Sequence, residues 1–206
     1  MPRFADLSVS QFLDALASAE PTPGGGTAAA ITGAMGTSLL VMVAGLPKTR
    51  GNTDEERAVL AGVRDAVQPM TARLAALADA DTEAFNQVMA AYKLAKGTDE
   101  EKAVRSAAIQ QGLRLATTTP LDTMRVAAAA LAQGVLVARL GNRSAASDLG
   151  VALGLLEAAA AGAALNVRTN LGSLKDEAFV AETTAALDEM SAMVVTDLAD
   201  ARAQIA

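Results

Sequence analysis

The chain of 206 residues contains no cysteine and no histidine. Without cysteine it has neither a disulfide framework nor a thiolate nucleophile, and without histidine it lacks the most common general base and the most common transition-metal ligand. Any chemistry must therefore run on carboxylates, lysine, arginine, Tyr92, hydroxyl groups or backbone amides. We accordingly expect no bound metal.

Aromatic residues and tracts of one charge are also scarce. The chain has four phenylalanines, one tyrosine and no tryptophan, and its net charge is −6 with acidic and basic residues interspersed. No run of lysine or arginine is present that could follow a phosphate backbone, so we do not expect nucleic acid as a partner. Asp6 and Asp14 interrupt the apolar residues of the N-terminus, which does not resemble a signal peptide. We therefore expect a cytoplasmic protein.

Hydrophobic residues make up 51% of the chain, and they recur with helical spacing. No segment alternates as a half-buried strand would, and no linker-like stretch divides the sequence. We predict an all-α fold in which residues 1–206 form a single-domain bundle of about six helices, some of them long. Capping boxes, Thr53 with Glu56 and Thr98 with Glu101, mark two helix starts, and Pro120 suits the first position of a helix. The helical segments are expected at residues 10–19, 27–44, 54–94 (kinked or divided at Pro69), 98–118, 120–140, 144–167 and 175–204.

Residues 27–46 carry no charge and have the length of a membrane-spanning helix. Only eight of these twenty residues are isoleucine, leucine, valine or methionine, and the others are mainly small. This composition favours a core helix over a membrane span, so we expect no membrane association. Ala29, Gly33 and Thr37 lie four residues apart and would allow a neighbouring helix to approach closely.

Three consecutive glycines, Gly24, Gly25 and Gly26, precede this helix. A loop without side chains exposes amide N–H groups beside the positive end of the following helix, which suits an anion or a flat polar ring. The alternative is that the glycines only punctuate a helix end. The run matches neither the phosphate-binding nor the dinucleotide-binding glycine pattern.

Two carboxylates interrupt apolar helical stripes. Asp81 falls between Leu77 and Phe85, and a buried unpaired charge there needs a partner or a function. Asp148 stands at one end of a second apolar face. For each carboxylate an alternative stays open: Asp81 can cap a break or turn in its helix around residues 78–82, and Asp148 can complement a helix dipole.

Asn166 and Asn170 stand at the other end of the same face as Asp148. Asparagines four residues apart on a helix more often form interhelical hydrogen bonds than take part in catalysis.

Five motifs carry a family resemblance: "PTPGGGTAAAITGAMG", "DADTEAFNQVMAAYKLAKGTDEEK", "TTTPLD", "GNRSAASDLGVA" and "NVRTNLGSLKDEAF". In this order, and over nearly the whole chain, they resemble the cyclodeaminase/cyclohydrolase family. That family includes the C-terminal domain of formiminotransferase-cyclodeaminase and stand-alone bacterial methenyltetrahydrofolate cyclohydrolases. The resemblance implies an all-α homodimer, or an assembly of dimers, that acts on one-carbon derivatives of tetrahydrofolate with no metal or other cofactor.

The resemblance also implies roles for individual residues. Lys48 and Arg50 keep the basic charge of a stretch that is basic and aromatic in many members, and we expect them to bind the glutamate tail of folate. The missing aromatic residue bears on substrate preference, and Ala95 replaces a proline that often precedes the lysine of the "KLAK" motif. The implied catalytic residues are Asp81, Lys96 and Asp148, and the other implied substrate-binding residues are Gly24, Gly25, Gly26, Phe85, Asn142, Asn166 and Asn170.

Three functions fit this resemblance. The first is hydrolysis of 5,10-methenyltetrahydrofolate to 10-formyltetrahydrofolate, in which an aspartate orients or deprotonates water and Lys96 supplies a proton. The second is deamination of 5-formiminotetrahydrofolate, which forms the methenyl compound and releases ammonia. The third is a non-catalytic helical module that binds folate or a partner subunit. A chain with this domain alone favours the hydrolase, and the sequence does not decide which aspartate is the base.

Overall fold

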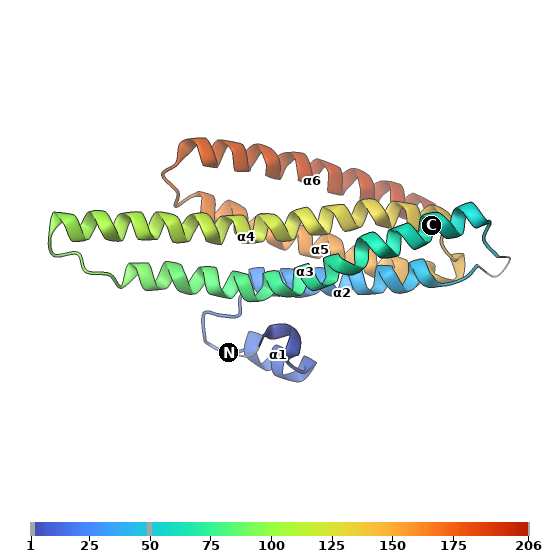
Figure 1. Ribbon diagram of the computed structural model, residues 1–206, viewed down its shortest axis with the longest axis horizontal. Helices are drawn as coiled ribbons and strands as arrows, with labels where there is room; N and C mark the ends of the chain where they lie inside the picture. Colours follow the sequence, from blue (N-terminus) through green and yellow to red (C-terminus); the bar gives the residue numbers. More distant parts are fainter. Residues whose placement is uncertain (1–2, 49–50, 206) are drawn as a thin grey trace.

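The computed structural model describes residues 3–48 and 51–205, and these residues form an elongated helical bundle (Figure 1). No strand occurs in the described ranges, which confirms the all-α prediction. The short helix α1 lies outside the bundle, near the N-terminus. The elements are η1 (Phe4–Asp6), α1 (Val9–Leu16), α2 (Gly25–Gly45), α3 (Asp54–Tyr92), α4 (Asp99–Leu140), η2 (Arg143–Ala145), α5 (Ala146–Leu171) and α6 (Glu177–Ile205).

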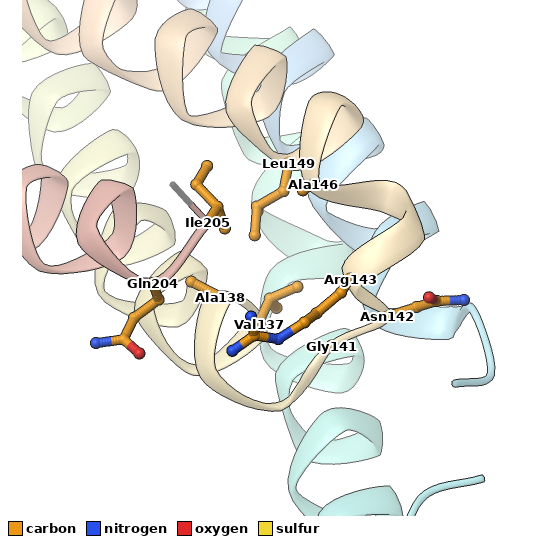
Figure 2. A pocket seen from close by; sticks show the side chains of 9 residues that line it. All are labelled: Val137, Ala138, Gly141, Asn142, Arg143, Ala146, Leu149, Gln204 and Ile205. Carbon is orange, nitrogen blue, oxygen red and sulfur yellow. The ribbon is translucent and has the colours of Figure 1, made fainter. Parts of the chain in front are cut away.

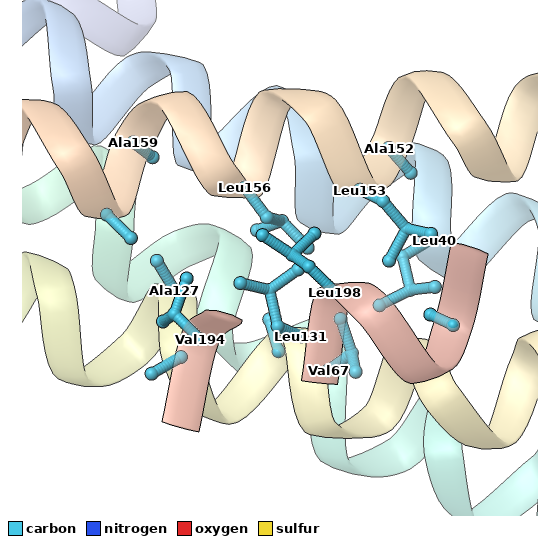
Figure 3. Close-up of a cluster of buried hydrophobic side chains, with 14 of the residues drawn as sticks. Leu40, Val67, Ala127, Leu131, Ala152, Leu153, Leu156, Ala159, Val194 and Leu198 are labelled. Atoms are coloured by element: carbon cyan, nitrogen blue, oxygen red, sulfur yellow. The ribbon is translucent and has the colours of Figure 1, made fainter. Parts of the chain in front are cut away.

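Four helices form the centre of the bundle. α2 packs against α3 and α5, and α4 packs against the same two helices from the other side, while α6 covers α4 and α5. Figure 3 shows the core between them, where Leu131, Leu153 and Leu156 are completely buried. Each buried leucine contributes about 1.5–3 kcal/mol of transfer free energy. The core therefore fixes the helices against one another along most of their length.

Both predicted capping boxes are present. The Thr53 hydroxyl accepts from the Glu56 amide at 3.2 Å, and the Glu56 carboxylate accepts from the Thr53 amide at 3.1 Å. Thr98 and Glu101 make the same reciprocal pair at 3.2 and 3.1 Å. These local signals place the starts of α3 and α4 where the sequence predicted them.

The prediction that Pro120 begins a new helix is wrong, because α4 runs without interruption through this residue. α3 likewise continues past Pro69 and past residues 78–82, so Asp81 does not cap a break in its own helix. An interior proline costs a helix about 3 kcal/mol. The apolar contacts that these two long helices make along the bundle outweigh that cost.

α2 begins two residues earlier than predicted. Gly24 is its N-cap and Gly25 and Gly26 form its first turn, so the glycines belong to the helix rather than to a preceding loop. Leu40 and Val43 are buried, as expected of a core helix.

By length and composition alone, α2, α4 and the stretch of residues 143–171 are long and apolar enough to cross a membrane. About half of each apolar window is buried inside the bundle.

Candidate functional site

A pocket of about 300 Å³ opens where α2 begins and α5 ends. α3 and α4 supply its remaining walls. Its volume is at the lower end of the range for small-molecule sites, roughly 300–1,000 Å³. The lining residues are Pro21, Thr22, Gly24, Gly25, Gly26, Asp81, Phe85, Val88, Leu113, Ala116, Asn166 and Asn170. Seven of the twelve predicted site residues therefore meet here: Gly24, Gly25, Gly26, Asp81, Phe85, Asn166 and Asn170.

Asp81 is the only carboxylate among the described residues that line this pocket. Its Oδ2 lies 3.1 Å from the hydroxyl of Thr27, in the first turn of α2. That hydroxyl is buried and also lies within 3.2 Å of the Thr82 hydroxyl and 3.3 Å of the Ala78 carbonyl. Burial raises the pKa of the Asp81 carboxyl above its ordinary value, and hydrogen bonds from Thr27 partly oppose the rise. The site thus holds a half-buried carboxylate that no arginine or lysine of the described residues neutralises.

Gly26 allows Asp81 to reach this position. A Cβ atom on Gly26 would lie 2.6 Å from Asp81 Cγ and 2.7 Å from its Oδ2, which is closer than such atoms approach. The carboxylate therefore packs directly on the α2 backbone, beside N–H groups that have no acceptor inside the helix. The predicted anion site at the glycines is thus already occupied by the protein's own carboxylate. A ligand here meets negative charge, which favours a cation or a group with N–H donors.

Phe85 lies one helical turn after Asp81 and, with Val88 and Leu113, forms the apolar wall of the pocket. Gly25 faces the opposite side, where a Cβ atom would lie 3.7 Å from the Asn166 amide nitrogen, an ordinary contact. A flat ring between Phe85 and the bare backbone of α2 would keep its polar edge within reach of Asp81. The pocket thus combines the apolar wall and the carboxylate that such a ring requires.

The two asparagines reach the pocket from the last turns of α5. Asn166 donates its side-chain amide to the Gly162 carbonyl at 2.9 Å, within its own helix. Asn170 donates to the Ala116 carbonyl of α4 at 2.7 Å, so the interhelical hydrogen bond that the sequence offered as an alternative is present for this residue. Both side chains still line the pocket.

Three other predicted site residues lie at the far end of the bundle. Asp148 is exposed in the first turn of α5, eighteen residues before Asn166, which places it about 27 Å away along the helix. The Lys48 ammonium follows the end of α2 and pairs with Glu56 at 3.0 Å. The 21 residues of α2 separate it from the glycines by about 30 Å. Asn142 lies at the same end, and Arg50 lies outside the described residues.

Lys96 lies neither in the Asp81 pocket nor beside Asp148, Lys48 and Asn142. It is exposed in the connection between α3 and α4, beyond the last residue of α3. About 16 Å of helix lies between Asp81 and the end of α3 at Tyr92. Within one chain, Lys96 therefore does not line the Asp81 pocket.

A second, smaller pocket of about 140 Å³ lies at the far end, between the ends of α4 and α6 and the start of α5 (Figure 2). Asn142 borders it, but its polar atoms are engaged elsewhere. Its Nδ2 donates to the Pro47 carbonyl at 2.6 Å, and its Oδ1 accepts from the Ser144 amide at 2.9 Å. These bonds tie the start of α5 to the end of α2, so Asn142 has a structural role in this chain.

Sequence reasoning missed Thr27 and the carbonyl of Ala116. Thr27 follows the glycines directly and is completely buried, so a polar residue in the first turn of an apolar helix was its available signal. The Ala116 carbonyl has no side-chain signal. Only the proline four residues later, which removes the helical donor for that carbonyl, marks it in the sequence.

The described residues thus define an all-α bundle with a half-buried carboxylate in a small-molecule pocket. The family model described as Formiminotransferase-cyclodeaminase matches residues 8–189. The chain belongs to this family.

Relatives with curated names and a solved structure agree with this assignment. The chain is 43% identical over 185 residues to the methenyltetrahydrofolate cyclohydrolase of Methylorubrum extorquens, which covers 90% of this chain and 89% of that protein. It is 36% identical over 171 residues to the formimidoyltransferase-cyclodeaminase of Sus scrofa, covering 83% of this chain but only 32% of the longer relative. The crystal structure of formiminotetrahydrofolate cyclodeaminase from Thermotoga maritima matches with a TM-score of 0.87 at 29% identity, over 98% of this chain and 96% of that one.

Proposed function

We propose that this protein hydrolyses 5,10-methenyltetrahydrofolate to 10-formyltetrahydrofolate in the Asp81 pocket. The observation that carries the proposal is the half-buried carboxylate, which has no cationic partner in the part of the chain that the structure describes and lies beside an apolar wall. The methenyl group is a delocalised amidinium cation, so it supplies the positive charge that the pocket lacks. The relative that is 43% identical over nine tenths of both chains is named a methenyltetrahydrofolate cyclohydrolase.

The reaction needs one group that takes and returns a proton. Water adds to the methenyl carbon, and Asp81 accepts the proton that the water loses. The bond from that carbon to N5 then breaks as N5 takes this proton from Asp81, while the hydroxyl group of the adduct loses its own proton to solvent and becomes the carbonyl of a formyl group on N10. Since Asp81 is the only carboxylate lining the pocket, among the described residues, it both takes the proton and returns it to N5. A raised pKa suits this double role, because it brings the carboxyl closer to the working pH.

The second candidate is deamination of 5-formiminotetrahydrofolate. It is supported by the likeness to the Thermotoga maritima cyclodeaminase, at a TM-score of 0.87 over nearly the whole of both chains. There N10 attacks the formimino carbon, N10 loses its proton and ammonia leaves with an added proton. The same carboxylate can carry both transfers. The two reactions share the methenyl compound, so one pocket serves either.

The discriminating experiment offers both substrates to the purified protein in parallel. Loss of the methenyl absorbance and release of ammonia are followed in separate reactions. Turnover of the methenyl compound without ammonia release from the formimino compound supports the hydrolase. The opposite pattern supports the deaminase, and no turnover of either leaves a folate- or partner-binding module.

We further propose that the protein is a cytoplasmic homodimer, or an assembly of dimers, formed through the outer faces of α2 and α5. These faces leave large apolar side chains exposed: Met35 51%, Met42 41%, Val151 56% and Leu165 64%. An apolar groove of about 550 Å³ runs along α2 beside Met35 and Met42. Such surface needs cover, and a second copy supplies it in a family implied to dimerise. Light scattering at micromolar concentration is expected to show at least a dimer without detergent, whereas a monomer, or a protein soluble only with detergent, contradicts this.

A second copy is also what the distant residues require. Asp148, Asn142 and Lys48 lie about 27–30 Å from the Asp81 pocket of their own chain, by the helix lengths given above. They can share a site with Asp81 only across two chains. The proposed roles of Asp148 in catalysis and of Lys48 in binding the glutamate tail therefore depend on the dimer.

A further inference from the structure

Pro120 lies in the interior of α4, one helical turn after Ala116, which lines the pocket. In a regular helix the carbonyl of Ala116 would accept from the N–H of residue 120, but proline has no N–H. The three threonines before Pro120 do not replace the missing donor. The Thr117 hydroxyl donates to the Leu113 carbonyl at 2.8 Å, and those of Thr118 and Thr119 donate to the Leu115 carbonyl at 3.1 and 3.0 Å.

Asn170 supplies the donor instead. Its Nδ2 lies 2.7 Å from the Ala116 carbonyl, and both residues line the pocket. A carbonyl oxygen only accepts hydrogen bonds, so the NH₂ branch of the amide must face Ala116. The Oδ1 branch is then fixed on the other side of the planar amide. Within residues 3–48 and 51–205, no group donates to this oxygen, which leaves it available to a ligand.

The orientation of the Asn166 amide is fixed in the same way, since its Nδ2 donates to the Gly162 carbonyl at 2.9 Å. The two amides therefore present acceptor oxygens to the pocket that also holds Asp81. This pattern is complementary to a ring edge rich in N–H donors. The amino-pyrimidinone ring of a tetrahydropterin, with its ring N–H and exocyclic amino groups, has such an edge.

We propose that Pro120 is a positioning residue for substrate recognition: by freeing the Ala116 carbonyl it holds the Asn170 amide with its oxygen toward the N–H edge of the bound pterin. The identity of the ligand rests on the proposed function, whereas the orientation of the amide does not. If Pro120 is replaced by alanine, the backbone N–H of residue 120 bonds the Ala116 carbonyl. This backbone donor competes with Asn170 for the carbonyl and loosens the orientation of the amide, although the helix itself gains a hydrogen bond.

The first test measures orientation without activity. In ¹⁵N-labelled protein, the side-chain NH₂ signals of Asn170 are identified by their loss in Asn170→Ala. We expect these protons to exchange slowly with solvent in the wild type and at least tenfold faster in Pro120→Ala. The control is Pro69→Ala, which removes the other interior proline, an exposed residue of α3. Pro69 also leaves a carbonyl without its helical donor, that of Asp65, but no described side chain donates to it. Unchanged Asn170 exchange in Pro120→Ala overturns the proposal.

The second test measures recognition. Pro120→Ala and Asn170→Ala should each raise the KM for 5,10-methenyltetrahydrofolate about tenfold with a smaller change in kcat. The double variant should be no worse than Asn170→Ala, because both changes remove one interaction. Pro69→Ala should keep the wild-type KM. If the two substitutions raise the KM additively, or if Pro120→Ala keeps the wild-type KM, the proposal is overturned. A wild-type protein that shows slow Asn170 exchange but neither binds nor converts folates would instead refute the proposed function.

Discussion

Replacing Asp81 by asparagine separates its chemical role from its structural one. The amide has nearly the same shape, so it fits against Gly26 and can still bond the Thr27 hydroxyl. It cannot accept the proton from water or stabilise the methenyl cation. We expect turnover of the preferred substrate to fall roughly a hundredfold or more, about 2.7 kcal/mol of transition-state stabilisation.

The same substitution should stabilise the fold at neutral pH. Burial raises the folded-state pKa of Asp81 above 3.8, so the native state holds this proton more tightly than the unfolded chain does. The stability that this group contributes is fully present below its unfolded pKa and is lost as pH rises through the folded value. Asparagine does not titrate and avoids this loss. The variant should therefore gain stability relative to the wild type as pH rises from about 3.5 to 7. The rate of the wild-type enzyme should fall as pH decreases, with an apparent pKa above that of an ordinary aspartate.

Urea unfolding of both proteins at pH 3.5, 5 and 7, together with initial rates, measures these effects. Asp65→Asn, on an exposed position of the same helix, is the matched control and should change neither rate nor stability appreciably. The reasoning is refuted if Asp81→Asn keeps a near wild-type rate. It is also refuted if the wild type becomes more stable than the variant as pH rises, because the carboxylate would then be stabilised rather than strained by its surroundings.

Three other perturbations test the neighbouring parts of the account. Gly26→Ala should displace Asp81 and lower turnover, and Gly25→Ala should weaken folate binding while leaving the melting temperature unchanged. The control Gly62→Ala, at an open helical position of α3, should leave binding intact. Affinities that fall only in step with the melting temperature would make the glycines purely structural. Exhaustive chelation with EDTA should leave activity unchanged because the chain has no histidine or cysteine, and restoration of a lost activity by a divalent ion would contradict this. Mixing inactive Asp81→Asn and Asp148→Asn proteins after subunit exchange should recover part of the wild-type rate if each site spans two chains, whereas a fully active Asp148→Asn protein would return that residue to a role at the helix dipole.

The sequence predicted the helices well where the signals are local. Thr53 and Thr98 cap α3 and α4 as their capping boxes indicated, because the bonds involved join residues only three apart. Pro120 was misread because its local preference for a helix start is overridden by packing along α4 and by a side chain 50 residues later. Local propensity contains no information about that donor.

The site was predictable in part for the same reason. Asp81 was found because it breaks an apolar stripe, and periodicity shows such a break whatever the partner is. The contact between Asp81 and Gly26 joins residues 55 positions apart, so neither residue alone reveals it. The motifs around Lys48 and Asp148 carry no information on which end of the bundle they occupy. The lengths of α2 and α5 decide that, and they place both residues away from Asp81.

The most direct test of the central claim is a crystal structure of the protein with bound tetrahydrofolate. We predict that the pterin ring lies between Phe85 and the backbone of Gly25, with its N–H edge toward the Asn170 oxygen. The reacting nitrogens N5 and N10 should then lie within reach of the Asp81 carboxylate. Density for the pterin at the other end of the bundle, beside Asn142 and Asp148 with an empty Asp81 pocket in every copy, would contradict it.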